Sequence, residues 1–292
     1  MRVAITGATG YVGRFLVAGA LGEGHSVTAL TRAAPGGPVG YLPFDLGSPP
    51  PDLSGFDLLI HAAFAHEPGR YRGGEGDDPD GFIARNLDGT RRLFDAAAAA
   101  EVPRIAFLSS RAVFDGLPAG TSLSEDLAPA PASLYGRAKL AAEEHLAALP
   151  VTGWSLRATG ILGLEPSDLP RVRPAPWRKW ETLLRDAIGG RAPEPRRGSE
   201  VHGADLAAAL ALILRHAPPS RPVHVSDVLL DTREILVEAA RALGRDLPLP
   251  PPSEAPVSVL DCGTLRGLGW RPGGRARLAE EMPALLAAYG LT

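Results

Sequence analysis

The sequence predicts an α/β protein built on a doubly wound parallel sheet, followed by a smaller and irregular C-terminal region. In the first 160 residues, short apolar runs alternate with segments of helical periodicity, a pattern typical of parallel strands whose two faces are covered by crossover helices. A glycine-rich turn directly follows the first apolar run. Beyond residue 160, prolines accumulate and the alternation weakens. We therefore predict two domains, 1–160 and 161–292.

Each element is predicted from its pattern of apolar residues. Short runs that read as buried strands lie at 3–6, 26–31, 57–62, 104–109 and 151–157, and a further strand is expected just before residue 45. Helical patterns lie between them at 11–21, 82–100 and 133–149. In the second domain we expect helices at 177–188, 203–216, 232–243 and 275–289, with short strands near 223–225 and 257–259. This region should pack over the carboxyl edge of the sheet, where such folds bind ligands.

Composition and charge exclude several classes of protein. With 45% hydrophobic residues and a net charge of −3, the chain is expected to be globular, with neither nucleic acid nor an anionic membrane as its partner. No apolar window is long enough for a membrane span or a signal peptide, so we expect a cytoplasmic protein. The single cysteine, Cys262, excludes an internal disulfide. The seven histidines show no zinc-like spacing, so no metal site is predicted.

The glycine turn after the first strand predicts a dinucleotide-binding site. Gly7 suits the tight turn, Gly10 lets the backbone approach a pyrophosphate, and Gly13 lets the helix pack closely on the strand. The start of the helix then offers N–H groups and a positive dipole end to the phosphates. A turn that collects glycines for steric reasons alone is the alternative. The other cofactor-binding residues predicted in this turn are Thr9, Tyr11 and Val12.

The end of the second predicted strand favours NADP over NAD. The carboxylate that usually binds the adenosine ribose of NAD is absent there, and Arg32 stands in its place. An arginine can pair with the 2′-phosphate of NADP, although a solvated arginine after a strand is the alternative. Asp45 and Leu46 are expected at the adenine edge. The small side chains of Ala62 and Ala63 leave room for the dinucleotide to cross the sheet.

Tyr135 and Lys139 are the predicted catalytic pair. Residues four apart on a helix lie on one face. A phenol has a pKa of about 10, and lowering it by about three units takes ~4 kcal/mol. A unit charge at about 4 Å in an effective dielectric of about 20 supplies roughly that much, so one lysine is enough. Such pairs also arise by chance in helices, which is the alternative.

The strand at 104–109 supplies the third catalytic candidate. It ends in two serines, and its carboxyl end should face the same crevice as the helix that carries Tyr135. Ser110 can hydrogen-bond a substrate oxygen and hold it within reach of the tyrosine hydroxyl. Ser109 is the alternative, and we expect its side chain to lie in packing.

Seven motifs together resemble the extended short-chain dehydrogenase/reductase family, also called the NAD-dependent epimerase/dehydratase family, with its Rossmann fold. They are Thr6–Gly13, Asn86–Thr90, Leu108–Gly116, Tyr135–Lys139, Ser155–Gly163, Val201–Asp205 and Leu268–Pro272. The resemblance implies that Tyr135 is the acid/base, that Lys139 binds the nicotinamide ribose and lowers the tyrosine pKa, and that Ser110 orients the substrate. Asn86 corresponds to a structural or catalytic asparagine of the family, and we count it among the cofactor-binding residues.

Within the family, Val113–Gly116 and Ser124–Asp126 look most similar to dTDP-dehydrorhamnose reductases. This implies an NADPH-dependent oxidoreductase that acts on a carbonyl or secondary alcohol of a sugar or sugar nucleotide. An epimerase is the alternative among enzymes. No extra acid/base pair stands beside Ser110, which counts against a dehydratase. A non-catalytic dinucleotide sensor is the alternative from another class, and the intact tyrosine–lysine pair disfavours it.

The remaining expectations concern the substrate and partners. The glycine-rich loop at 65–80 either lines the substrate site or is a plain insertion. A group of basic residues could hold a substrate diphosphate or form a solvated basic face, namely Arg171, Arg173, Arg178, Lys179, Arg196 and Arg197. The family often forms homodimers, and here the helices at 86–100 and 135–149 could pair with their copies.

Overall fold

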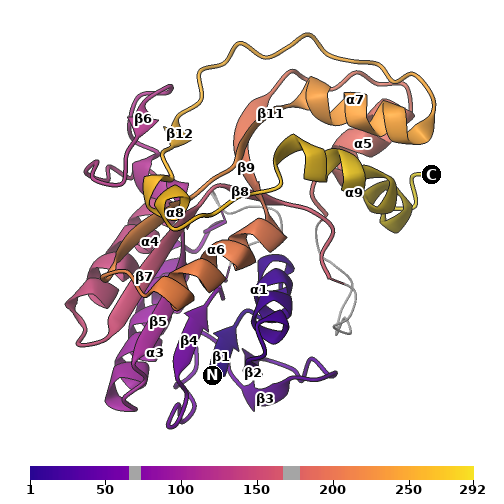
Figure 1. Cartoon of the computed structure of the whole chain (residues 1–292). Helices are drawn as coiled ribbons and strands as arrows, with labels where there is room; N and C mark the ends of the chain where they lie inside the picture. Colours follow the sequence, from indigo (N-terminus) through magenta and orange to yellow (C-terminus); the bar gives the residue numbers. More distant parts are fainter. Residues whose placement is uncertain (66–73, 167–177) are drawn as a thin grey trace.

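The computed structural model describes residues 1–65, 74–166 and 178–292, and its centre is a seven-stranded sheet (Figure 1). The strand order is β3-β2-β1-β4-β5-β7-β10, and every neighbouring pair is parallel. The strands are β1 (Arg2–Thr6), β2 (Ser26–Thr31), β3 (Gly40–Pro43), β4 (Leu58–His61), β5 (Arg104–Ser110), β7 (Thr152–Ala158) and β10 (Arg221–Val225). The predicted fold class is confirmed.

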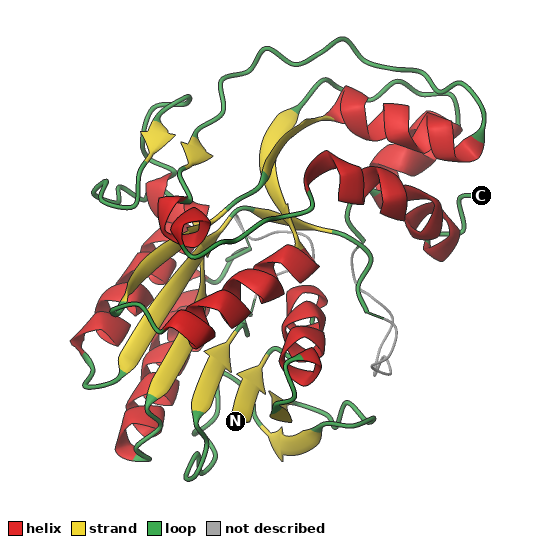
Figure 2. Ribbon diagram, in the orientation of Figure 1, coloured by secondary structure: helices red, strands yellow, loops and turns green. Residues whose placement is uncertain are grey.

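Helices cover both faces of this sheet (Figure 2). The helices α1 (Tyr11–Gly22) and α6 (Gly203–His216) lie side by side on one face. The other face carries α3 (Gly89–Ala99) and α4 (Leu134–Ala148). Alternation along β1 serves both layers, because Val3 and Ile5 join the core under α1 whereas Ala4 joins the core under α3. The direction of winding reverses between β1 and β4, the place where doubly wound sheets bind dinucleotides.

The helix predicted at 82–100 is divided into three parts. It consists of α2 (Pro79–Ile83), a π-helical turn at Ala84–Asp88, and α3. Single π turns within helices are frequent at functional sites. Here the turn carries Asn86, one of the predicted site residues.

The C-terminal region contains a small second sheet and its own hydrophobic core. The sheet has the order β11 (Val228–Asp231), β9 (Arg197–His202), β8 (Gly160–Leu162). The helices α5 (Glu181–Ile188), α7 (Thr232–Leu243) and α9 (Gly274–Ala288) lie together beyond it (Figure 1). Their core includes Leu162, Leu184, Leu236, Met282 and Leu286. A two-stranded pair of β6 (Ser122–Leu123) and β12 (Val259–Leu260), with α8 (Gly263–Gly267), completes the fold.

One predicted strand belongs to a different sheet than expected. The strand near 223–225 was expected within the C-terminal region, but as β10 it pairs with β7 and forms the edge of the main sheet. Its valines are fully buried between the helical layers. Gly19 lets α6 approach α1, because a Cβ there would lie 2.7 Å from the Cβ of Ala207. The main sheet and its helices therefore draw on residues from both sides of position 160.

Among the described residues, no helix combines the length and hydropathy that a membrane crossing requires.

Candidate active site

The glycine turn between β1 and α1 leaves no room for larger residues. Gly7 has φ +68°, and a Cβ there would lie 2.7 Å from the backbone nitrogen of Ala63. A Cβ on Gly13 would lie 2.0 Å from the carbonyl oxygen of Gly7. Among the described residues, no side chain caps α1 and its first turn contains no acid. The first N–H groups of α1 are thus suited to bind an anionic pyrophosphate.

A buried hydrogen-bond chain joins the ends of β1 and β4 beside this turn. The Thr6 hydroxyl accepts the backbone N–H groups of residues 62–63 at 3.2 Å each and lies 2.7 Å from Nδ1 of His61. Nε2 of His61 lies 2.9 Å from the Thr90 hydroxyl, which itself donates to a backbone carbonyl. His61 must therefore donate from Nε2 and accept at Nδ1. Burial and the nearby Lys139 lower the pKa of His61 to about 3, so it stays neutral.

Asn86 holds the segment that follows β4. Its amide nitrogen donates to the carbonyls of Ala65 at 2.7 Å and Phe82 at 3.0 Å, and its amide oxygen accepts the Ala65 N–H at 2.7 Å. Both amide hydrogens are thus used within the protein. These contacts hold Ala65, which closely follows Ala62 and Ala63 on the predicted path of the dinucleotide.

Three contacts dock one face of α4 on the end of β5 and the turn that follows it. A Cβ on Gly136 would lie 2.3 Å from the carbonyl oxygen of Ala112, so only glycine allows this approach. One turn further along, Lys139 Nζ donates to the Leu108 carbonyl at 2.7 Å. After another turn, Glu143 accepts a hydrogen bond from the Ser109 hydroxyl. Tyr135 and Lys139 are therefore held at the carboxyl end of β5, next to the turn that starts at Ser110.

The Lys139 ammonium lies among aromatic rings. It is 4.6 Å from the ring centroid of Phe64, 4.7 Å from that of Phe107 and 5.8 Å from that of Tyr135. The residue is 5% exposed. Burial lowers the pKa of Lys139 to about 7, while the negative charge of Glu143 acts to raise it. The charge state of this lysine therefore changes close to neutral pH.

A buried ion pair lies behind Lys139. Nη2 of Arg157 is 2.7 Å from one carboxylate oxygen of Glu143, and its Nε is 3.1 Å from both. The guanidinium also lies 5.0 Å from the ring centroid of Phe114. The Ser109 hydroxyl donates to Glu143 and is buried, in agreement with the expectation that this side chain lies in packing. Neither Glu143 nor Arg157 was predicted from the sequence, although Glu143 stands four residues after Lys139.

Ser110 begins the short 3₁₀ turn Arg111–Phe114 at the end of β5. Its hydroxyl oxygen accepts the N–H of Ala112 at 3.1 Å. This bond uses the oxygen as an acceptor and leaves the hydroxyl hydrogen to donate to a ligand.

Asp115 secures the start of α4, a function that sequence reasoning missed. One carboxylate oxygen accepts the N–H groups of Ala132 at 2.7 Å and Ser133 at 3.2 Å, and the other accepts the Ser133 hydroxyl. Ser133 in turn caps α4 by accepting the N–H of Gly136 at 3.0 Å. The Val113–Gly116 motif therefore positions the helix that carries Tyr135.

Of the residues predicted to contact the adenosine part of the cofactor, Arg32 has the most accessible side chain. Its side chain is 77% exposed, and Nε lies 3.8 Å from a carboxylate oxygen of Asp45, whose side chain is 47% exposed. The side chain of Leu46 belongs to the core under α3, and its carbonyl accepts Nη2 of Arg92 at 3.0 Å. An adenine contact from Leu46 would have to come from its backbone.

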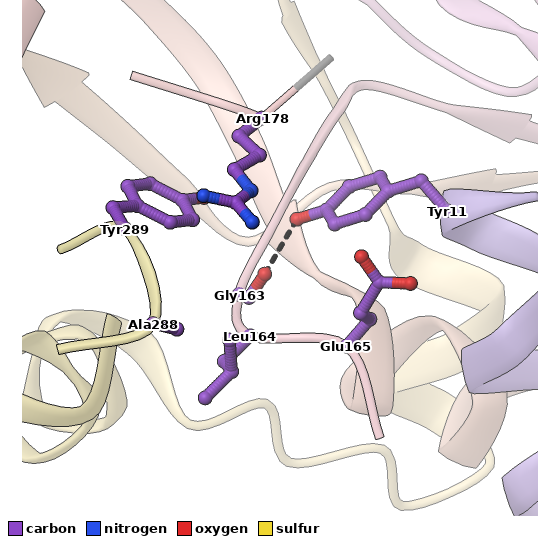
Figure 3. Close-up of a pocket in the computed structure, with 7 residues that line it drawn as sticks. All are labelled: Tyr11, Gly163, Leu164, Glu165, Arg178, Ala288 and Tyr289. Carbon is purple, nitrogen blue, oxygen red and sulfur yellow. Dashed lines mark hydrogen bonds between the residues drawn. The ribbon is translucent and has the colours of Figure 1, made fainter. Parts of the chain in front are cut away.

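The start of α1 also reaches the C-terminal region (Figure 3). The Tyr11 hydroxyl donates to the Gly163 carbonyl at 2.6 Å, and burial raises the pKa of this phenol. Nε of Arg14 lies 2.8 Å from a carboxylate oxygen of Glu165. Beside them the Arg178 guanidinium lies over the ring of Tyr289, the residue that follows α9, with its carbon 5.4 Å from the ring centroid. Tyr11, predicted to bind the cofactor, thus directs its hydroxyl group to the C-terminal region.

The described members of the predicted basic group have separate partners. Arg178 contacts Tyr289, whereas Lys179 pairs with Glu200 on β9. Arg197 donates to the Ser253 carbonyl at 3.5 Å. Arg171, Arg173 and residues 66–73 of the predicted loop lie outside the described residues. Within the described ranges, no three His, Cys, Asp or Glu side chains are grouped as metal ligands.

Several known proteins are similar to this chain in sequence. The chain is 32% identical over 176 residues to dTDP-6-deoxy-L-talose 4-dehydrogenase (NAD(P)(+)) of Kitasatospora kifunensis, covering 56% of this chain and 53% of that protein. It is 30% identical over 163 residues to UDP-glucose 4-epimerase of Mycolicibacterium smegmatis, covering 50% of each. The chain thus spans about half the length of these two curated relatives. It is also 27% identical to dTDP-4-dehydrorhamnose reductase of M. smegmatis, covering 91% of this chain and 73% of that one.

The fold matches solved structures over nearly the whole chain. MoeE5 in complex with UDP-glucuronic acid and NAD superposes with a TM-score of 0.78 at 22% identity, covering 99% of both chains. At that identity the match shows the fold alone. Residues 3–225 match the family described as NAD dependent epimerase/dehydratase. This confirms the predicted resemblance, and the chain belongs to the NAD-dependent epimerase/dehydratase family of extended short-chain dehydrogenases/reductases.

Proposed function

We propose that the chain is an NAD(P)-dependent oxidoreductase that transfers hydride to or from a carbonyl or secondary alcohol of a sugar or sugar nucleotide. The observation that carries this proposal is the docking of α4, which holds Tyr135 and the buried Lys139 beside the end of β5. A bound dinucleotide would supply or accept the hydride at its nicotinamide ring. The small-molecule substrate would enter from the side of the C-terminal region.

The protein's own residues would handle the proton. Ser110 would donate its hydroxyl hydrogen to the substrate oxygen and orient it. Tyr135 would give a proton to that oxygen in reduction and take it back in oxidation. Protonated Lys139 would favour the phenolate form of Tyr135 by its charge and would hydrogen-bond the nicotinamide ribose. Because the rings of Phe64 and Phe107 flank this ammonium, few water molecules compete for its charge.

The decisive variant is Tyr135→Phe. It removes only the hydroxyl, so dinucleotide affinity should stay within about twofold while turnover of a sugar-nucleotide substrate falls by about a thousandfold or more. Tyr41→Phe, at an exposed tyrosine on β3, is the matched control. If Tyr135→Phe kept full turnover, the acid/base assignment would be wrong. A cellular output that persists without turnover would point to the dinucleotide sensor instead.

For the cofactor we propose a preference for NADP over NAD. The mostly exposed Arg32 can accept a 2′-phosphate, and its nearest carboxylate, that of Asp45, is 3.8 Å away. Titration with NADPH and NADH tests this preference. Arg32→Ala should weaken NADPH binding about tenfold and leave NADH unchanged. Arg91→Ala on α3, which removes a partly exposed arginine that also pairs with an aspartate, is the control. Equal NADPH affinity before and after Arg32→Ala would remove the preference.

A sugar-nucleotide epimerase is the second candidate. The relative that favours it is the UDP-glucose 4-epimerase of M. smegmatis, 30% identical over 163 residues. An epimerase returns the hydride to its substrate and therefore keeps the same dinucleotide bound. Dinucleotide at full occupancy in the purified protein, with no need for added cofactor in turnover, would support the epimerase over the oxidoreductase.

We also propose a homodimer formed through α3 and α4. These helices lie next to each other on one face of the sheet. Nε2 of His145 on α4 is 2.7 Å from a carboxylate oxygen of Asp95 on α3. Sedimentation equilibrium tests the mass. A dimer that persists in a variant with charged residues on the outer side of α3 would contradict this assignment.

A further inference from the structure

Lysine is almost absent from this chain, and the side chains of its two lysines are both buried. Of 30 basic residues, 28 are arginines, and the lysines are Lys139 and Lys179. Both are buried, at 5% and 8% exposure. The lysine of α4 belongs to the proposed catalytic pair. The second lysine is therefore worth comparing with the arginines that surround it.

Two other buried ion pairs between described residues use arginine. The side chains of Arg14 and Glu165 are 5% and 9% exposed, and those of Arg157 and Glu143 are each 4% exposed. Arginine suits such pairs because its rigid fork binds a carboxylate through two N–H groups. The pair between Lys179 and a glutamate has a compact ammonium instead. An ammonium has three rotatable donors, so after its bond to the carboxylate it can still donate to a ligand.

The partner of Lys179 is Glu200, and it lies over a glycine. In the small sheet Glu200 of β9 pairs with Gly160 of β8. A Cβ on Gly160 would lie 2.1 Å from a carboxylate oxygen of Glu200, so any other residue would displace this carboxylate. The side chains of Lys179 and Glu200 retain 10% and 16% exposure. Both groups are thus packed closely and still reachable.

The pair also lies near the end of the catalytic strand. Gly160 is two residues beyond Ala158, and Ala158 pairs with Ser110 across β7 and β5. Figure 1 shows β8 and β9 between the main sheet and the C-terminal helices. Through Glu200 the pair therefore lies on the part of the small sheet that directly follows the carboxyl end of β7.

Backbone strain accompanies this arrangement. Trp180, the residue before α5, has φ +63°, a left-handed conformation that bulky residues rarely adopt. Such strain is concentrated at ligand sites, where the surrounding structure maintains it. Burial lowers the pKa of Lys179, and Glu200 acts to raise it.

We propose that Lys179 and Glu200 form a binding site for a hydroxyl group on the sugar part of the substrate. A hydroxyl can accept a hydrogen bond from the ammonium and donate one to the carboxylate at the same time. A phosphate would be attracted by Lys179 but repelled by Glu200, so the pair favours a neutral polar group over an anion. This inference rests on the proposed function, because it names the part of the substrate that the C-terminal region recognises.

The scarcity of lysine provides a direct test. Protein labelled with ¹³C at the lysine ε-carbon should give two side-chain NMR signals, assigned with Lys139→Arg and Lys179→Arg. We expect NADPH to shift the Lys139 signal. With NADPH present, UDP-glucose should shift the Lys179 signal, whereas UDP alone should leave it in place. A Lys179 signal that moves equally with UDP would indicate phosphate binding, and one that moves with neither ligand would indicate a structural pair. Both results would overturn the inference.

Affinity measurements with variants complete the test. Glu200→Gln should weaken UDP-glucose binding about tenfold and leave UDP binding unchanged, because only the sugar loses a charge-assisted acceptor. Glu181→Gln, at a more exposed glutamate on α5 that pairs with Arg185, is the control and should change neither affinity. Unchanged UDP-glucose affinity in Glu200→Gln would contradict the inference. If NADPH still shifted the Lys139 signal in that case, the proposed function would stand without it.

Discussion

The charge of Glu143 should set the pH range in which the proposed catalytic pair works. Lys139 and Glu143 are one helical turn apart, a separation of about 6 Å. At an effective dielectric of about 20, two unit charges at that distance interact by about 3 kcal/mol, or about two pKa units. Burial lowers the pKa of Lys139 to about 7 even with Glu143 in place. Glu143→Gln should therefore lower it further, by about one to two units.

The sign of the effect follows from which form is needed. Lys139 acts as the ammonium, which exists below its pKa. In the wild type roughly half of this lysine is charged at pH 7, whereas in Glu143→Gln only a few per cent would be. Turnover at pH 7 should then fall by roughly tenfold and recover as the pH is lowered towards 5.

The assay is the pH titration of the Lys139 ε-carbon signal together with the pH profile of turnover. Because Glu143→Gln leaves Arg157 without its partner, the double variant Glu143→Gln/Arg157→Met provides a form without the buried unpaired cation. Glu144→Gln changes an exposed glutamate on the same helix and is the control. If Lys139 titrated at the same pH in wild type and in both Glu143 variants, the electrostatic argument would be refuted.

Three further predictions follow from other parts of the structure. Gly13→Ala should abolish dinucleotide binding in a fluorescence titration, whereas Gly22→Ala, where a Cβ meets nothing within 4 Å, should not. The pKa of buried His224 is lowered to about 4 by burial and by the charge of Arg157. As the pH falls below about 6.5, this histidine is protonated first in the unfolded state, so the folded protein loses stability. His224→Gln removes this contribution. Between pH 6 and 4 the free energy of unfolding, measured by urea denaturation, should then fall less steeply in the variant, by about 1.4 kcal/mol per pH unit. Asp115→Ala should cost about 1–2 kcal/mol of stability, because the start of α4 loses its acceptors, and turnover should fall as well. Unchanged urea midpoints in that variant would contradict its assigned task.

The sequence by itself determined the features that depend on neighbours along the chain. Apolar runs such as Val3–Ile5 form buried strands because both their faces need cover, and the helical spacing that follows them supplies it. The turn from Gly7 to Gly13 was recognisable because only glycine satisfies its backbone geometry. Tyr135 and Lys139 were predicted as a pair because helical spacing alone places them on one face.

The tertiary structure decided what depends on residues far apart in the chain. Sequence pattern marked a strand near Val223, but its place at the edge of the main sheet depends on its pairing with β7. The hydroxyl of Tyr11 is directed to Gly163, 152 residues away. The carboxylates of Glu143 and Glu200 could not be assigned a role from the sequence, because only tertiary packing brings them to Arg157 and Lys179. Local propensity carries no information about such partners, because the burial and charge that define them arise only when distant segments fold together.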